Sequence, residues 1–234
     1  MNKVTFSRLG ELQYDINEAY KTLRTNLSFC GDDIKVILLT SCTPNEGKST
    51  VCIRLAQALG EDNKKVLVVD ADLRKSVLIG RHGVTSEKEI KGLSHYLSGQ
   101  ETLDNITYET NIQGVDIIFS GPVTPIPTEL LGNSYFEDMI TGCRDKYDYI
   151  IVDAPPLGYV IDAAVISRVC DGAIFVIEDQ VISYRFAQSV MKQLELTKCK
   201  MLGAIINKVD TKTGGYYNGY SYYKGYGHRY GKYS

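Results

Sequence analysis

Residues 42–50 could bind the phosphate groups of a nucleotide. The segment reads Cys-Thr-Pro-Asn-Glu-Gly-Lys-Ser-Thr, after an apolar run at 36–40 and before a helix-like segment at 51–59. Strand, loop and helix in this order are typical of a P-loop, where backbone N–H groups at the helix start point at phosphates. Lys48 would add positive charge, and Ser49 a hydroxyl for Mg²⁺. The alternative is an ordinary strand-to-helix turn.

The P-loop pattern is incomplete at its first position, where Cys42 replaces glycine. Asn45 can take the positive φ that such loops often need, as few other non-glycine residues can. The expected nucleotide-binding residues are Thr43, Pro44, Asn45, Glu46, Gly47, Lys48, Ser49 and Thr50, with Asn207 at a later strand end.

Carboxylates follow two further apolar runs. Asp70 and Asp72 come at the end of the run at 66–69, and Asp153 ends the run at 149–152. Ligands of open α/β sheets bind beyond the carboxyl ends of the strands, so these acids could hold a metal or move a proton. An apolar strand ending in Asp is the Walker B arrangement for Mg²⁺. For Asp70 and Asp72, a helix cap plus a solvated acid is the alternative.

The elements that would position these residues alternate along the chain. Strands are expected at 36–40, 66–70, 115–119, 149–153, 173–177 and 202–206, and helices at 15–29, 51–59, 92–97, 128–144 and 184–196. Alternating strands and helices predict an α/β fold with a doubly wound, mainly parallel sheet. With the P-loop, this predicts a P-loop NTPase of the partitioning-ATPase-like group.

Composition limits the remaining possibilities. The 234 residues carry a net charge of −2 and include six scattered cysteines without a Cys-x-x-Cys pair. We therefore expect a reducing compartment, no zinc site and no nucleic-acid partner. No apolar run is long enough for a membrane span, and the first residues lack a signal peptide's apolar stretch. We expect a flexible segment at 1–14 and one domain at 15–210.

Residues 211–234 differ from the rest of the chain. They contain no acid, four Lys or Arg, and no aliphatic residue, so we expect a disordered tail. The segment contains eight tyrosines separated by glycines: Tyr216, Tyr217, Tyr220, Tyr222, Tyr223, Tyr226, Tyr230 and Tyr233. Such a tail could be a phosphate acceptor, or a low-complexity segment that stacks on nucleic-acid bases.

Taken together, these motifs resemble those of the bacterial tyrosine kinases (BY-kinases), in their cytoplasmic Gram-positive form. The resemblance runs from Glu18 to the C-terminus and rests on the P-loop, the acidic motif at 66–74, the Walker B segment at 149–156 and the tyrosine-rich tail. Segments at 92–99 and 129–131 also match the family. The chain departs from its pattern at Asn45 (usually Gly), at Lys21 (usually Arg) and at Glu178 (often Arg).

The resemblance implies transfer of the γ-phosphate of ATP to tyrosine. Lys48 would stabilise the phosphoryl charge, Asp70 would accept the tyrosine proton, and Ser49, Asp72 and Asp153 would hold Mg²⁺. The tail tyrosines would be phosphorylated in trans, in a kinase that regulates capsular or exopolysaccharide synthesis and export.

The resemblance also implies partners. Glu18, Lys21 and Arg24 would join identical subunits in a ring, although their spacing alone indicates a solvated helix face. A membrane adaptor of the polysaccharide co-polymerase type would activate the kinase at the membrane periphery, and a tyrosine phosphatase would reverse the reaction. Two alternatives remain: an ATP-driven partitioning or positioning switch, and a GTPase, because 207–210 reads Asn-Lys-Val-Asp.

Overall fold

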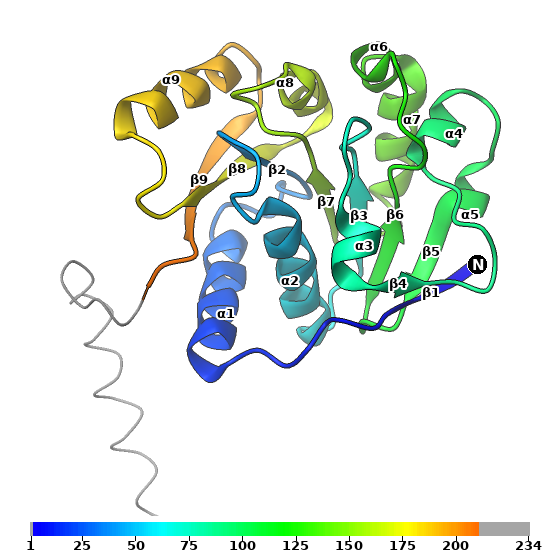
Figure 1. Cartoon of the computed structure of the whole chain (residues 1–234), viewed down its shortest axis with the longest axis horizontal. Helices are drawn as coiled ribbons and strands as arrows, with labels where there is room; N and C mark the ends of the chain where they lie inside the picture. Colours follow the sequence, from blue (N-terminus) through cyan, green and yellow to red (C-terminus); the bar gives the residue numbers. More distant parts are fainter. Residues whose placement is uncertain (1, 211–234) are drawn as a thin grey trace, which may run out of the picture.

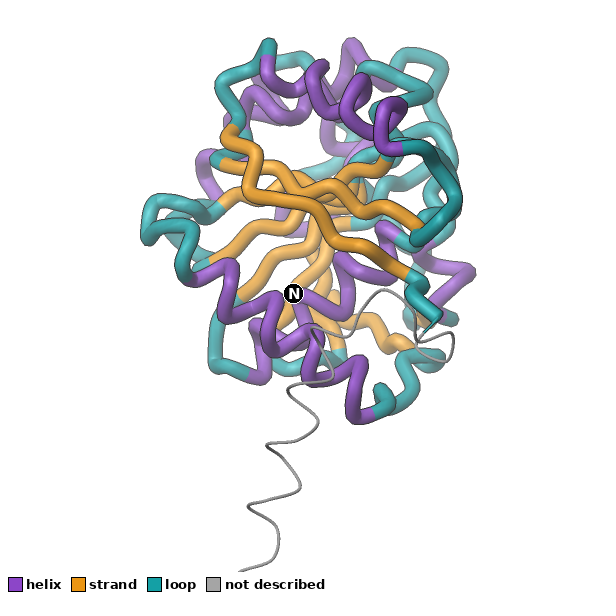
Figure 2. The backbone as a smooth tube through the Cα atoms, turned by 90° about the vertical axis from the view of Figure 1, so that its left-hand side faces the viewer, coloured by secondary structure: helices purple, strands orange, loops and turns teal. Residues whose placement is uncertain are grey.

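The computed structural model describes residues 2–210, which form one nine-stranded sheet with helices on both faces (Figures 1 and 2). The strand order is β4-β1-β5-β6-β3-β7-β2-β8-β9. The strands are β1 (Asn2–Phe6), β2 (Val36–Ser41), β3 (Val66–Asp70), β4 (Val84–Thr85), β5 (Thr107–Thr110), β6 (Val115–Ile118), β7 (Tyr149–Asp153), β8 (Gly172–Glu178) and β9 (Lys200–Asn207).

Helices follow most of the strands, as expected, but β5 and β6 are joined without one. The helices are α1 (Tyr14–Ser28), α2 (Lys48–Glu61), α3 (Leu78–His82), α4 (Leu93–Leu97), α5 (Leu103–Ile106), α6 (Pro127–Leu131), α7 (Ser134–Cys143), α8 (Asp162–Ile166) and α9 (Tyr184–Glu195), with a 3₁₀ turn at Ser167–Val169. None of the helices in residues 2–210 is long and apolar enough to cross a bilayer.

Alternating side chains of the central strands form two hydrophobic cores. On β2, Val36 and Leu38 pack with residues of α7, α8 and α9, whereas Ile37 and Leu39 pack with residues of α1 and α2. Because both faces of the sheet are covered, the central strands are apolar on both sides. This explains why they read as continuous apolar runs in the sequence.

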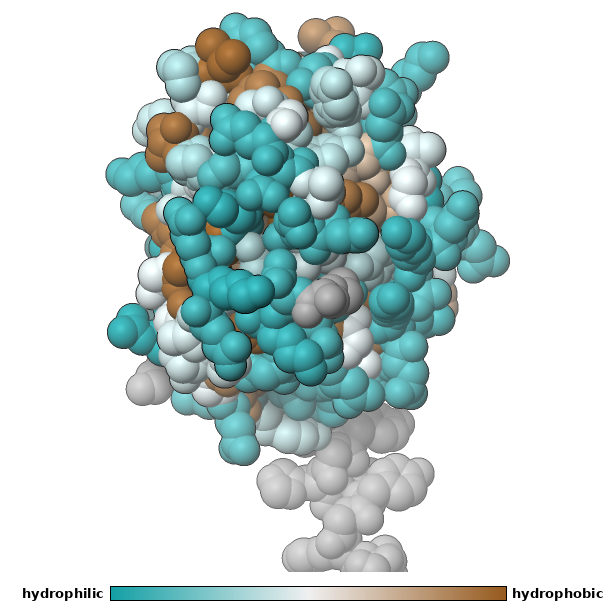
Figure 3. Space-filling view, turned by 90° about the vertical axis from the view of Figure 1, so that its right-hand side faces the viewer, coloured by the Kyte–Doolittle hydropathy of each residue, from teal (hydrophilic) through white to brown (hydrophobic). Residues whose placement is uncertain are grey.

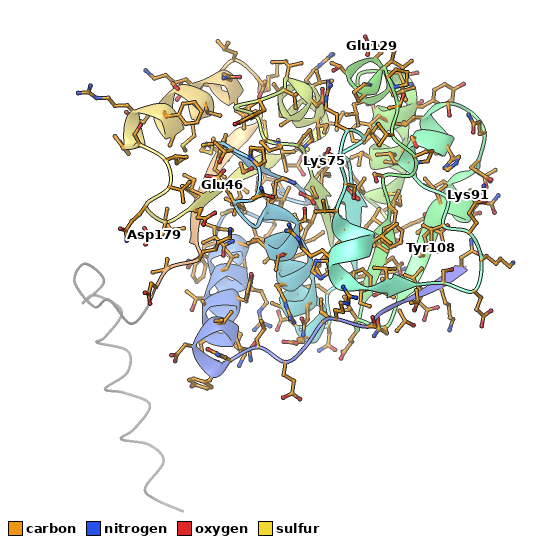
Figure 4. The ribbon with its side chains drawn as sticks, viewed as in Figure 1. Glu46, Lys75, Lys91, Tyr108, Glu129 and Asp179 are labelled. Carbon is orange, nitrogen blue, oxygen red and sulfur yellow. The ribbon has the colours of Figure 1, made fainter. Side chains whose placement is uncertain are left out.

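Parallel pairing brings the carboxyl ends of the central strands to one edge. Asp70 at the end of β3 is in register with Asp153 at the end of β7, and Leu39 of β2 is also in register with Asp153. In Figure 4, Glu46 and Lys75 lie at this edge, while Lys91 and Tyr108 lie on the far flank. The sheet thus positions the P-loop beside the two acidic motifs.

The structure corrects several expectations. Residues 2–6, expected to be flexible, form β1, which pairs in parallel with β5 and buries Val4 and Phe6. The helix expected at 128–144 is two helices, because Gly132 ends α6 and the side chain of Asn133 caps α7. The sheet also contains two antiparallel pairings, β1 with β4 and β5 with β6.

The side of the molecule that carries β1 and α5 is largely hydrophilic, with scattered apolar residues (Figure 3). An exposed ion pair between Lys3 and Glu109 lies on β1 and β5. The P-loop lies away from this side, at the carboxyl edge of the central strands.

Candidate active site

The P-loop is a tight turn between β2 and α2. Gly47 precedes the helix with φ +87°, and Asn45 also has a positive φ of +69°. A side chain at Gly47 would collide with the Asn207 amide, so this position requires glycine. No side chain caps the start of α2. Its first N–H groups are therefore available to an anionic ligand.

Lys48 and Asp153 form a buried ion pair at the centre of the site. Lys48 Nζ donates a hydrogen bond to Asp153 Oδ1, and the two residues are 8% and 1% exposed. Burial by itself would lower the pKa of Lys48, but the charge of Asp153 raises it above its ordinary value. Lys48 is consequently a fixed positive charge at the helix start, where phosphate oxygens would be bound.

Asp70 is as deeply buried as Asp153. It is 1% exposed, and Ser76 Oγ donates a hydrogen bond to its Oδ2. Burial, followed by the charge of Asp153, raises the pKa of Asp70 to about 7, although Ser76 and Lys48 oppose the shift. A carboxylate with a pKa in this range is suited to exchange a proton near neutral pH.

Asp72 belongs to the same group of charges, because its carboxylate raises the pKa of Lys48. Asp72 Oδ1 accepts hydrogen bonds from the backbone N–H groups of Arg74 and Lys75, at 3.2 and 3.0 Å. These two bonds fix the loop after β3 around its carboxylate. The structure thus brings Lys48, Asp70, Asp72 and Asp153 into one site.

Sequence reasoning missed the contacts that hold this loop in place. Arg74 Nε lies 2.6 Å from Asp162 Oδ2 and its Nη2 lies 2.9 Å from Asp162 Oδ1. Thr128 Oγ1 also donates to Asp162, at 2.6 Å. Asp162 is fully buried at the start of α8, and these hydrogen bonds lower its pKa although burial opposes them. Arg74 lies within the acidic motif and Thr128 begins an expected helix, but no sequence signal marked Asp162 as their partner.

The oxygen ligands of this site suit a Mg²⁺ ion that is held partly by the protein and partly by the phosphates of a nucleotide. Within residues 2–210, no cluster of three or more His, Cys, Asp and Glu side chains could hold a metal ion. Mg²⁺ is ordinarily bound by one or two carboxylates together with water and substrate phosphates. Asp153, Asp72 and the Ser49 hydroxyl in the first turn of α2 fit that role.

Glu46 and Asn207, the last residue of β9, hold the rest of the P-loop in place. Glu46 is buried, and its Oε2 accepts the backbone N–H of Thr43 at 2.7 Å. Asn207 Nδ2 donates to the backbone carbonyl of Glu46 at 2.8 Å. Figure 4 shows Glu46 and Asp179 in this region. Asn207 is therefore next to the P-loop, whereas the tail tyrosines lie outside the described residues.

The residues expected to join subunits have partners within the chain. Lys21 Nζ lies 2.7 Å from Glu18 Oε1, one helical turn away on α1. Arg24 Nη1 donates to the Ala58 carbonyl of α2 at 2.9 Å. Glu18 and Lys21 are each 44% exposed in their side chains, while the Arg24 side chain is 23% exposed. Two of the three side chains are thus available at the surface.

The fold and the site together define a P-loop nucleotide-binding protein. A family model described as "AAA domain" matches residues 34–205. Over 199 residues the chain is 41% identical to the tyrosine-protein kinase CpsD of Streptococcus agalactiae serotype III (strain NEM316), covering 85% of each chain. The chain belongs to the AAA-domain family and, within it, to the bacterial tyrosine-protein kinases. The predictions of a tyrosine kinase and of a P-loop α/β fold are confirmed.

Solved structures agree with this assignment. The kinase domain of Escherichia coli tyrosine kinase ETK superposes with a TM-score of 0.76 at 31% identity, covering 83% of this chain and 78% of that one. The chimerical protein CapA2B2 gives 0.77 at 28% identity, with 83% and 85% covered. The septum site-determining protein MinD of Pyrococcus horikoshii, complexed with Mg-ADP, gives 0.63 at 28% identity, with 74% and 70% covered.

Proposed function

We propose that this kinase transfers the γ-phosphate of Mg-ATP to tyrosines of its own tail, 211–234, in trans. The observation that carries the proposal is the site formed by Lys48, Asp153 and Asp70 at the start of α2. Phosphoryl transfer needs mainly positioning and charge stabilisation, and these residues supply both.

Each side chain has a separate role in this proposal. Lys48 neutralises charge on the transferred phosphoryl group. Ser49, Asp72 and Asp153 would hold Mg²⁺, which would supply positive charge to neutralise the phosphate oxygens. Asp70, whose pKa is about 7, accepts the proton of the attacking tyrosine. Backbone N–H groups of the loop from Asn45 to Thr50 would surround the phosphates, and Asn207 supports this loop.

The tail supplies acceptors that a positioning switch does not need. Its eight tyrosines are separated by glycines, and 24 residues of such a chain could reach the site of a neighbouring subunit.

We propose that subunits assemble in a ring through Glu18, Lys21 and Arg24, and that phosphorylation ends the assembly. Each phosphate adds about −1.5 to −2 charges at neutral pH. The phosphorylated tails of neighbouring subunits therefore repel one another, and this repulsion weakens the ring.

The biological setting is also proposed. By its membership of the CpsD-type kinases, the chain would regulate capsular or exopolysaccharide synthesis. The similar CapA2B2 protein is a chimera, which supports a separate activator, proposed to be a membrane adaptor that holds the kinase at the inner membrane surface. A tyrosine phosphatase would reset the tail. ATP is proposed as the nucleotide, and GTP binding tighter than ATP binding in calorimetry would contradict this choice.

Mixing two full-length variants tests transfer in trans. One variant is Lys48→Met with its tail intact, and the other has an intact site with all eight tail tyrosines changed to Phe. We expect phosphotyrosine on the Lys48→Met chain, at a rate that rises with concentration. Co-expression of the two variants allows mixed assemblies to form. If the wild type phosphorylates itself but the Lys48→Met chain carries no phosphotyrosine, either after mixing or after co-expression, the transfer occurs in cis.

A further inference from the structure

Lys208, just beyond β9, connects the P-loop to the end of β8. Its Nζ donates to the backbone carbonyl of Asn45 at 2.7 Å and lies 2.7 Å from Glu178 Oε2. Lys208 has a positive φ of +57°, an uncommon conformation for a residue with a long side chain. The backbone conformation at Lys208 is therefore held by its surroundings.

The charge at position 178 determines whether Lys208 is held over the P-loop. An arginine at 178 would place a second positive charge beside Lys208, and the two would repel. The acid at 178 instead attracts Lys208 and holds it over the Asn45 carbonyl. Glu178 and the Asn45 carbonyl are thus connected through one side chain.

The planarity of the peptide bond gives these contacts a consequence for the phosphate site. In a trans peptide, the C=O of one residue and the N–H of the next point in opposite directions. Lys208 binds the carbonyl of Asn45, so the N–H of Glu46 is directed away from Lys208. Asn207 binds the carbonyl of Glu46, so the N–H of Gly47 is directed away from Asn207.

We propose that Lys208 and Glu178 are positioning residues for nucleotide binding. They act on the P-loop backbone, orienting its N–H groups toward the phosphates before the ligand enters. This inference rests on the proposed nucleotide site. A loop already held in its binding conformation loses less entropy on binding, so the pair increases affinity for any ligand with the same phosphates.

The alternative role for Lys208 is direct contact with the base, which would follow from the GTPase-like sequence at 207–210. The two roles predict different nucleotide dependence. Orientation of the P-loop affects ATP and GTP equally, because their phosphates are identical. Contact with the base changes the ratio of the two affinities.

The test titrates Mg-ATP and Mg-GTP into the full-length wild type, Lys208→Met and Lys208→Arg. Lys200→Met is the matched control, because Lys200, the first residue of β9, donates to the Cys30 carbonyl at 3.2 Å, at the end of the strand remote from Lys208. Loss of one charged hydrogen bond to a carbonyl is expected to weaken binding about tenfold. We expect this loss for both nucleotides in Lys208→Met, and near wild-type affinity in Lys208→Arg and Lys200→Met.

Kinetics and a second substitution complete the test. Lys208→Met should raise KM for ATP about as much as it weakens binding, with kcat and the thermal midpoint close to those of Lys200→Met. Glu178→Arg should weaken binding in the wild type and add nothing in the Lys208→Met background. Unchanged affinity in Lys208→Met, or unequal losses for ATP and GTP, would overturn the proposal. Failure of the wild type to bind either nucleotide would instead overturn the proposed function.

Discussion

Lys48 at the first position of α2 and Asp153 at the last position of β7 form an ion pair, 105 residues apart in the chain. Both residues are largely withdrawn from solvent. Two buried opposite charges stabilise each other strongly, and either one alone would be costly. The pair fixes the positive charge of the P-loop directly over the carboxyl edge of the sheet.

Lys48→Met should reduce tyrosine phosphorylation at least about 100-fold, because one charged donor is lost from a water-poor phosphate site. The measurement is the phosphotyrosine content of the purified full-length protein after incubation with Mg-ATP. Thermal unfolding and circular dichroism serve as the control, since the variant leaves Asp153 without its cation. A folded variant with wild-type phosphotyrosine would remove Lys48 from the mechanism.

Asp70→Asn and Asp72→Asn should produce different defects. Asp70→Asn removes the proton acceptor, so kcat should fall about 100-fold or more while nucleotide affinity changes little. Asp72→Asn removes a metal ligand, so the Mg²⁺ concentration needed for half-maximal rate should rise. Asp116→Asn is the control, because Asp116 on β6 is a buried acid that accepts a hydrogen bond from the Tyr147 hydroxyl and has no role in the proposed reaction. Identical Mg²⁺ dependence in both site variants would contradict these separate roles.

The sequence predicted those strands and site residues whose signal lies in a short stretch of neighbouring residues, and it missed those that depend on distant partners. The runs at 66–70 and 149–153 predicted β3 and β7 because strands covered on both faces are continuously apolar. β1 was missed because five residues with mixed polarity carry little signal, and the partner strand that buries Val4 is about 100 residues away. The Arg74 to Asp162 contact joins residues 88 positions apart, so no local spacing could predict it.

Acid should weaken the fold through Asp171. Burial alone would raise its pKa, but hydrogen bonds from Arg144 and from the N–H groups of Val36 and Lys35 lower it below the ordinary value. A lowered pKa stabilises the folded state above the ordinary value of about 4, and this contribution disappears as pH falls through the folded-state pKa. Asp171→Asn should therefore cost about 1–3 kcal/mol at pH 7.

Urea unfolding of wild type and Asp171→Asn between pH 7 and pH 2.5 checks this expectation. The difference in unfolding free energy should shrink as the pH falls below about 4. Asp145→Asn, an exposed neighbour of Arg144 in the chain, is the control and should resemble the wild type throughout. A difference that stays constant down to pH 2.5 would show that the Asp171 charge does not contribute.

A Glu18→Ala/Lys21→Ala/Arg24→Ala variant should assemble less than the wild type. Glu18 and Lys21 are half-exposed, so they are available to a second subunit, and breaking their polar contacts should dissociate a ring. Light scattering of unphosphorylated proteins measures the masses. The matched control is Glu89→Ala/Lys91→Ala, which removes another surface ion pair, near β5. Equal masses for the triple variant and the wild type would exclude this face as the subunit contact.

Intact-mass spectrometry of the full-length protein after incubation with Mg-ATP tests the central claim most directly. The account predicts mass gains of one to several phosphate groups, located by peptide mapping on tyrosines within 211–234 and absent from Lys48→Met. ADP release from the wild type without any gain in mass would contradict it, because the site would then hydrolyse ATP as a switch does and transfer no phosphate to tyrosine.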